Sequence, residues 1–143
     1  MPFVHTIRPR YAEVDQQGVV FNGHWLTYFD DASTRFFEHL GFTPKEVFAE
    51  GGLFDVMVVK AVLEWKGPAG FDDLVEISVR PDRIGTASFD LRYTATLDGA
   101  GVCEGVITYV SVKPGKRESA PIPDELREGL EKEMTESGGL DLH

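Results

Sequence analysis

Asp15 and Asn22 have the residue types and the spacing that acyl-transfer chemistry needs. Asp15 begins a turn-forming group at positions 15–18 (DQQG), and Asn22 is the predicted cap of the most apolar helix in the chain. The unpaired N–H groups and positive dipole end of that helix would then lie close to the carboxylate. A carbonyl can be attacked where a base or nucleophile stands near donors for the resulting oxyanion. Asp15 also fits a plain turn role, because Asp side chains bond the backbone of turns.

The chain has no other familiar catalytic signature. It has no glycine loop for phosphates, no nucleophile elbow, and no paired Cys or His at metal-ligand spacing, so no metal is expected. Cys103 falls in a predicted strand without a neighbouring His, which indicates a buried structural thiol. The histidines are scattered along the chain: His5, His24, His39 and His143.

An apolar stripe predicts the helix that begins near Asn22. Its members follow one another at steps of four, three, four and four, which places them on one helical face, and Gly41 follows as a stop. A face this bulky needs a wide, flat cover, and a sheet would provide one. The stripe consists of Trp25, Phe29, Ala32, Phe36 and Leu40.

Most of the remaining core is predicted as strands, so the fold class is α+β. An extended segment over 2–14 comes first, and Pro9 makes it an edge or bulged strand. Residues 54–65 are almost continuously apolar, which is typical of a strand buried on both faces or at a subunit contact. Further strands are predicted by alternation and hairpin signals at 75–80, 88–97 and 102–112.

Two shorter helices complete the predicted domain. One spans 44–50, with Pro at its first position. The other begins near Pro123 and carries a thin apolar stripe, so it is expected to be short and docked on the surface. Residues 1–136 are predicted to form a single domain, and 137–143 a flexible tail.

Composition limits the classes of partner. The 143-residue chain has a formal net charge of −10 and no basic block, which argues against nucleic acid or an anionic membrane as partner. No stretch approaches the roughly 18 apolar residues of a membrane span. The single cysteine cannot close an internal disulfide, which fits a reducing compartment, and we expect a cytoplasmic protein.

The segment around Asp15 resembles a known family signature. Residues 10–32 (RYAEVDQQGVVFNGHWLTYFDDA) are similar to the signature of hot-dog-fold acyl-CoA thioesterases, and most of all to the 4-hydroxybenzoyl-CoA thioesterase type. The similarity continues through 71–74 (FDDL) and 83–89 (RIGTASF) and ends near 121–123 (PIP). It implies a hot-dog fold, in which about five antiparallel strands wrap one long central helix and subunits pair their sheets edge to edge as a homodimer or homotetramer.

The same resemblance implies roles for individual residues. It makes Asp15 the catalytic carboxylate and the backbone N–H of Asn22 the group that polarises the carbonyl. No separate cofactor is implied, because coenzyme A is part of the substrate. Asn22 stands where many relatives have His or Tyr, and Trp25 replaces a usual Tyr. Substrate contacts are implied at Gly18, Trp25, Val58, Val59, Lys60, Arg83 and Ser88.

The expected activity is hydrolysis of an acyl-CoA thioester to free acid and CoA, with Asp15 as nucleophile or general base. Three alternatives stay open. The acyl group could arrive on an acyl carrier protein, although the acidic chain offers little for an acidic carrier to dock on. The protein could bind acyl-CoA without cleaving it, or be a hydratase, although the Asp/His pair of hydratases is missing. Aromatic, short and medium acyl groups all remain possible, because one methylene changes selectivity by only about 1–3 kcal/mol.

Overall fold

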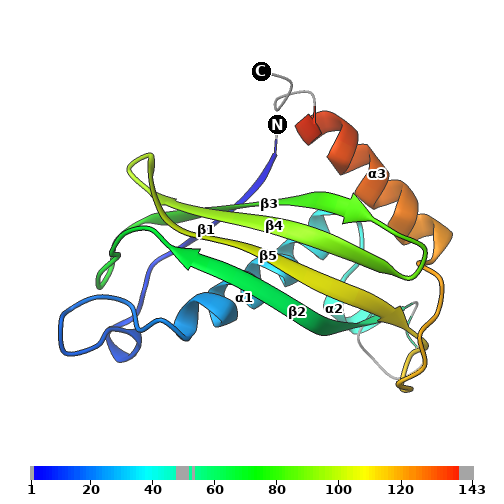
Figure 1. Cartoon of the computed structure of the whole chain (residues 1–143), viewed down its shortest axis with the longest axis horizontal. Helices are drawn as coiled ribbons and strands as arrows, with labels where there is room; N and C mark the ends of the chain where they lie inside the picture. The colour runs from blue at the N-terminus through cyan, green and yellow to red at the C-terminus, as the bar shows by residue number, and fades with distance from the viewer. Residues whose placement is uncertain (1, 48–51, 53, 139–143) are drawn as a thin grey trace.

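The five strands form one antiparallel sheet in the order β1-β3-β4-β5-β2. The structure is a computed structural model that describes residues 2–47, 52 and 54–138. The long helix α1 lies against one face of the sheet, so the predicted α+β arrangement is confirmed (Figure 1). The strands are β1 (Phe3–Ile7), β2 (Asp55–Trp65), β3 (Val75–Ile84), β4 (Ser88–Leu97) and β5 (Ala100–Val112). The helices are η1 (Tyr11–Glu13, a 3-10 turn), α1 (His24–His39), α2 (Pro44–Val47) and α3 (Asp124–Gly138).

The predicted aromatic stripe of α1 packs on the inner face of the sheet. Phe29 stacks on Tyr93 of β4, with ring centroids 4.9 Å apart. Opposite Tyr93, β5 carries Gly105, where a Cβ would come within 3.0 Å of the Phe29 ring. The glycine therefore makes the close approach of helix and sheet possible. Trp25, Ala32 and Phe36 are also buried, as the periodicity predicts.

The edge strand β2 corrects one expectation. Burial on both faces is wrong for the single chain, because none of the residues of β2 is fully buried. The strand is also an edge strand, which pairs with β5 and has no strand of the described chain on its other side. Much of its length is exposed, and a bulge interrupts the pairing between Val58 and Lys60. The exposed large apolar side chains of β2 are Met57, Val58, Val59, Val62 and Trp65.

Several predicted boundaries shift. The extended segment over 2–14 is wrong beyond Ile7, because the chain turns into η1 after Pro9. The cap of α1 is Gly23, one residue later than predicted. Gly41 does stop the helix, with φ +106°.

The two shorter helices also differ from their predicted lengths. For α2, the predicted residues 48–50 lie outside the described residues. The last helix, α3, is longer than expected and includes Ser137 and Gly138, while 139–143 of the predicted tail lie outside the described residues. Its apolar side is fully buried through Leu126 and Leu130, which packs the helix along β3 (Figure 1). In the described chain, no helix combines the length and apolar character needed to cross a membrane.

Candidate active site

Residues 13–21 form a small hairpin at one end of the sheet, and this hairpin carries Asp15. Phe21 N–H donates to the Glu13 carbonyl at 3.0 Å, and Asp15 N–H donates to the Val19 carbonyl at 2.8 Å. These two bonds hold the arms of the hairpin together, so Asp15 stands at the start of its tip.

The Asp15 carboxylate is half-buried and only partly engaged. Its Oδ1 accepts the N–H of Gln17 at 2.8 Å and that of Val19 at 3.5 Å, which is the turn role that the sequence also allowed. Oδ2 has no hydrogen-bond partner among the described residues. At the tip, Gly18 has φ +79°, a left-handed conformation that favours glycine. The turn therefore orients the carboxylate through Oδ1 and leaves Oδ2 unbonded within the described residues.

A second contact fixes the hairpin against the rest of the chain. Val20 N–H donates to the Ala69 carbonyl at 2.8 Å, and Val19 lies opposite Gly70 in an antiparallel bridge. A Cβ at Gly70 would come within 3.1 Å of the Gly18 carbonyl oxygen. Glycine at position 70 therefore allows the tip of the hairpin to lie directly on this segment.

The second arm of the hairpin leads straight into α1. His24 and Trp25 donate their N–H groups to the carbonyls of Phe21 and Asn22, which forms the first turn. Within the described chain, the N–H groups of Asn22 and Gly23 have no acceptor. Free N–H groups at a helix N-terminus can stabilise an oxyanion.

A groove of about 600 Å³ runs between the start of α1 and the last half of β2. Its wall is mostly apolar, and two smaller hollows continue it along the helix, both bordered by Val58, Asp30 and Tyr109. Asp15 does not itself line this groove. The groove residues are Asn22, Gly23, Leu26, Ala61, Val62, Leu63 and Trp65.

The other residues predicted to contact substrate do not lie together in one site. Trp25 is 2% exposed and packs on Tyr28 and Phe29, so it lies in the core rather than on the groove wall. Val59 is exposed at the bulge of β2, while Val58 borders the hollows beside α1.

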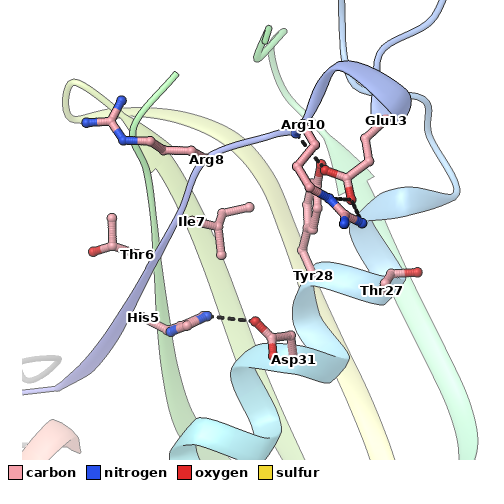
Figure 2. A pocket seen from close by; sticks show the side chains of 9 residues that line it. All are labelled: His5, Thr6, Ile7, Arg8, Arg10, Glu13, Thr27, Tyr28 and Asp31. Carbon is pink, nitrogen blue, oxygen red and sulfur yellow. Dashed lines mark hydrogen bonds and ion pairs between the residues drawn. The ribbon is translucent and has the colours of Figure 1, made fainter. Parts of the chain in front are cut away.

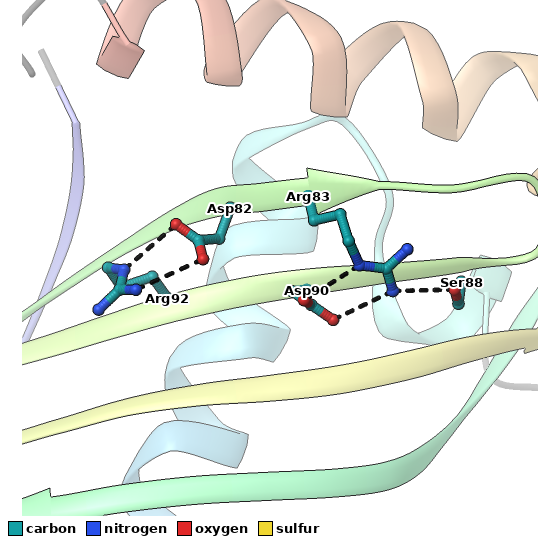
Figure 3. A network of polar contacts seen from close by, with 5 residues as sticks. All are labelled: Asp82, Arg83, Ser88, Asp90 and Arg92. Carbon is teal, nitrogen blue, oxygen red and sulfur yellow. Dashed lines mark hydrogen bonds and ion pairs between the residues drawn. The ribbon is translucent and has the colours of Figure 1, made fainter. Parts of the chain in front are cut away.

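Lys60, Arg83 and Ser88 lie on the outer face of the sheet. Arg83 Nη2 donates to Ser88 Oγ at 2.9 Å, and its Nε donates to Asp90 at 3.1 Å (Figure 3). Four paired strands, β2, β5, β4 and β3, carry neighbouring residues in one row across the sheet: Lys60, Thr108, Asp90 and Arg83. Burial raises the pKa of Asp90, but hydrogen bonds from Arg83 and Thr108 outweigh this effect and leave it below its ordinary value. In one chain, the end of β3 that carries Arg83 and the hairpin lie towards opposite ends of the sheet (Figure 1).

The sequence did not point to Glu13, which forms the most perturbed carboxylate beside the hairpin. Its side chain is 8% exposed. It accepts hydrogen bonds from Arg10 N at 2.7 Å, Arg10 Nη2 at 2.9 Å and the Tyr28 hydroxyl at 2.9 Å (Figure 2). Burial raises the pKa of Glu13, but these donors together lower it from 4.5 to about 2. Burial and the Glu13 charge hold the pKa of Tyr28 well above its ordinary value. The one feature of the sequence that could have pointed to Glu13 was its place inside the segment that resembles the family signature.

Two remaining sequence expectations concern the thiol and metal sites. Cys103 is 1% exposed, and burial raises its pKa to about 11, which confirms a buried structural thiol. Over residues 2–47, 52 and 54–138, no group of three His, Cys, Asp or Glu side chains could hold a metal ion.

A long helix wrapped by a five-stranded antiparallel sheet is the architecture of the hot-dog thioesterases, as the sequence resemblance implied. The chain belongs to the thioesterase-like superfamily, whose family model matches residues 9–130. A hypothetical protein from Thermus thermophilus of known crystal structure is 30% identical and superimposes with a TM-score of 0.83, over 91% of this chain and 98% of that one.

Several relatives carry functional names, and two of them match most of this chain. The acyl-CoA thioester hydrolase YbgC of Escherichia coli O157:H7 is 25% identical over 118 residues, which cover 82% of this chain and 87% of that protein. A 1,4-dihydroxy-2-naphthoyl-CoA hydrolase of Nostoc punctiforme is 23% identical over 141 residues, which cover 99% of this chain and 95% of that protein. Thioester hydrolysis is thus the activity named among the relatives.

Proposed function

We propose that this chain hydrolyses an acyl-CoA thioester to a free carboxylic acid and CoA, with no further cofactor. Family membership and the naming of its relatives support the reaction class. The observation that carries the proposal is the hairpin: it holds a carboxylate with one unpartnered oxygen, and its second arm continues directly into the free N–H groups of Asn22 and Gly23.

Asp15 supplies the attacking or proton-accepting oxygen. In the first form, Oδ2 attacks the thioester carbonyl carbon, the C–S bond breaks to release CoA thiolate, and water hydrolyses the resulting anhydride. In the second form, Oδ2 takes a proton from a water molecule that attacks the same carbon. The C–S bond of the tetrahedral intermediate then breaks, and the proton passes from Asp15 to the departing CoA thiolate. In both forms the amides at the start of α1 stabilise the oxyanion. One such donor contributes about 10²–10³ in rate, and a general base about 10²–10⁴.

The groove between α1 and β2 receives the acyl end of the substrate. Its apolar wall suits a hydrocarbon or aromatic acyl group, and it begins at Asn22 and Gly23, where the carbonyl would lie. Val58 and Val59 then border the path of the pantetheine arm.

A second copy of the chain completes the site. The free edge of β2 carries unpartnered backbone groups and exposed apolar side chains, a combination that favours pairing with an identical edge. Two β2 strands paired antiparallel about a two-fold axis would bring the hairpin end of one sheet towards the β3–β4 end of the other. Lys60, Arg83 and Ser88 of one copy could then meet the CoA phosphates bound by its partner.

A thiol-release assay over a panel of acyl-CoAs tests the function. Aromatic, short-chain and medium-chain thioesters should be compared, with each acyl group also presented on acyl carrier protein. We expect CoA release from at least one class. Tight binding of acyl-CoA without any thiol release would instead identify a non-catalytic acyl-CoA-binding protein.

A further inference from the structure

We propose that Glu13 is a positioning residue that sets Asp15 against the free N–H groups of Asn22 and Gly23. This inference rests on the proposed function, because it gives Glu13 a role only through Asp15. Glu13 stands at the base of the hairpin, two residues before Asp15, and its side chain is buried.

Glu13 ties three parts of the molecule together. Its carboxylate accepts the Tyr28 hydroxyl of α1 at 2.9 Å and the Arg10 N–H that opens η1 at 2.7 Å. Its backbone carbonyl accepts the N–H of Phe21 at 3.0 Å. Helix, turn and hairpin therefore share one anchor.

Glu13 lies close to both groups of the proposed site, the Asp15 carboxylate and the N–H groups at the start of α1. Phe21, its backbone partner, directly precedes Asn22, and Tyr28 lies in the second turn of α1. A shift of Glu13 would move Asp15 and the start of α1 relative to each other. Reacting groups tolerate little of this, because a misplacement of about 1 Å can cost about 100-fold in rate.

Glu13 lies outside the groove proposed for the substrate, so its role is to position other residues and not to contact the substrate. Glu13 does not line the groove between α1 and β2. It lines a different cavity of about 460 Å³ between β1 and α1, together with Tyr28 and Arg10 (Figure 2). A change at Glu13 should thus alter turnover and leave substrate affinity in place.

Two variants and one matched control test the role. Glu13→Gln keeps the size and one acceptor oxygen but removes the charge, and Tyr28→Phe removes only the hydroxyl that Glu13 accepts. Glu133→Gln is the control, because Glu133 is a second carboxylate that is 8% exposed. It lies on α3, outside the hairpin, and pairs with His39 at the end of α1. Each protein is first shown to be folded by its thermal transition.

In a thiol-release assay, we expect both variants to lower kcat about 10- to 100-fold and to leave KM within about twofold. Amide hydrogen exchange of residues 13–23 should speed up in both. Glu133→Gln should keep the wild-type kcat and wild-type exchange of this segment. A wild-type kcat in both Glu13→Gln and Tyr28→Phe, or an equal loss in Glu133→Gln, would overturn the inference.

Asp15→Asn separates this inference from the function on which it rests. If Asp15→Asn hydrolyses the thioester at the wild-type rate, the proposed role of Asp15 fails, and with it the role of Glu13. If Asp15→Asn is inactive while both other variants turn over normally, the function stands and only the positioning role fails.

Discussion

The Tyr28 hydroxyl donates to the Glu13 carboxylate at 2.9 Å, and this bond joins the hairpin that carries Asp15 to the helix whose N-terminus faces the groove. The two residues are 15 positions apart and come from different elements. Because the bond is buried, it is sheltered from competing water. The hairpin with the Asp15 carboxylate and the helix with the free N–H groups are therefore connected within one chain.

Replacement of Asp15 by Asn should abolish most hydrolysis without unfolding the protein. The amide oxygen of Asn can still accept the Gln17 N–H that Asp15 Oδ1 accepts now, so the turn should persist. Loss of the base or nucleophile should lower kcat about 10²–10⁴-fold. Thiol release measures the rate and circular dichroism the fold. Near wild-type turnover in Asp15→Asn would refute the assignment.

The oxyanion role of Asn22 belongs to its backbone and can be separated from its side chain. Asn22→Ala keeps the N–H and should keep most activity. Asn22→Pro removes an N–H that has no acceptor within the described chain. We expect about 10²–10³-fold lower kcat for Asn22→Pro alone. Equal activities of the two variants, with matching thermal transitions, would exclude this amide as the donor.

Glu13 should also make the free energy of unfolding depend on pH below about pH 4.5. Its pKa is about 2 in the folded protein against an ordinary value of 4.5. Because the folded value is the lower one, ionised Glu13 stabilises the fold fully above pH 4.5, and this contribution is lost as the pH falls through about 2.

The size of this contribution is about 3 kcal/mol, from the difference between the two pKa values. Glu13→Gln should therefore reduce the free energy of unfolding in urea by about this amount at pH 7, and by progressively less below pH 4.5. Glu38→Gln is the control, since it breaks an exposed ion pair with Arg35. A deficit for Glu13→Gln that stays constant from pH 7 to pH 2.5 would contradict the expectation.

A charge on the free edge of β2 should block pairing with a second copy. Val59 is 58% exposed at the bulge, so Val59→Lys leaves the core of the single chain unchanged. We expect the wild type to sediment as a dimer or tetramer and Val59→Lys to dissociate at least about 10-fold more readily. Val4→Lys serves as control, because Val4 is 44% exposed on β1 at the opposite edge. A wild type that sediments as a monomer, or greater dissociation of Val4→Lys, would rule out β2 as the contact.

Local patterns predicted much of the fold. The stripe from Trp25 to Phe36 follows the helical period, and residues 88–97 alternate as a strand must, so both elements could be predicted from neighbours in the chain. Local patterns do not fix helix boundaries to the residue, because a cap depends on which backbone groups find partners. The start of α1 shifted to Gly23 for this reason.

Residue type and spacing along the chain were enough to predict the helix, the strands and a carboxylate in a turn before the helix. The packing of the elements, in contrast, established that Glu13 bonds Tyr28 and that Trp25 belongs to the core. It also placed the end of β3 that carries Arg83 towards the opposite end of the sheet from the hairpin. It also decided that β2 is an exposed edge. Such contacts join residues far apart in sequence, and their geometry follows from how the packed layers meet, which no local period encodes.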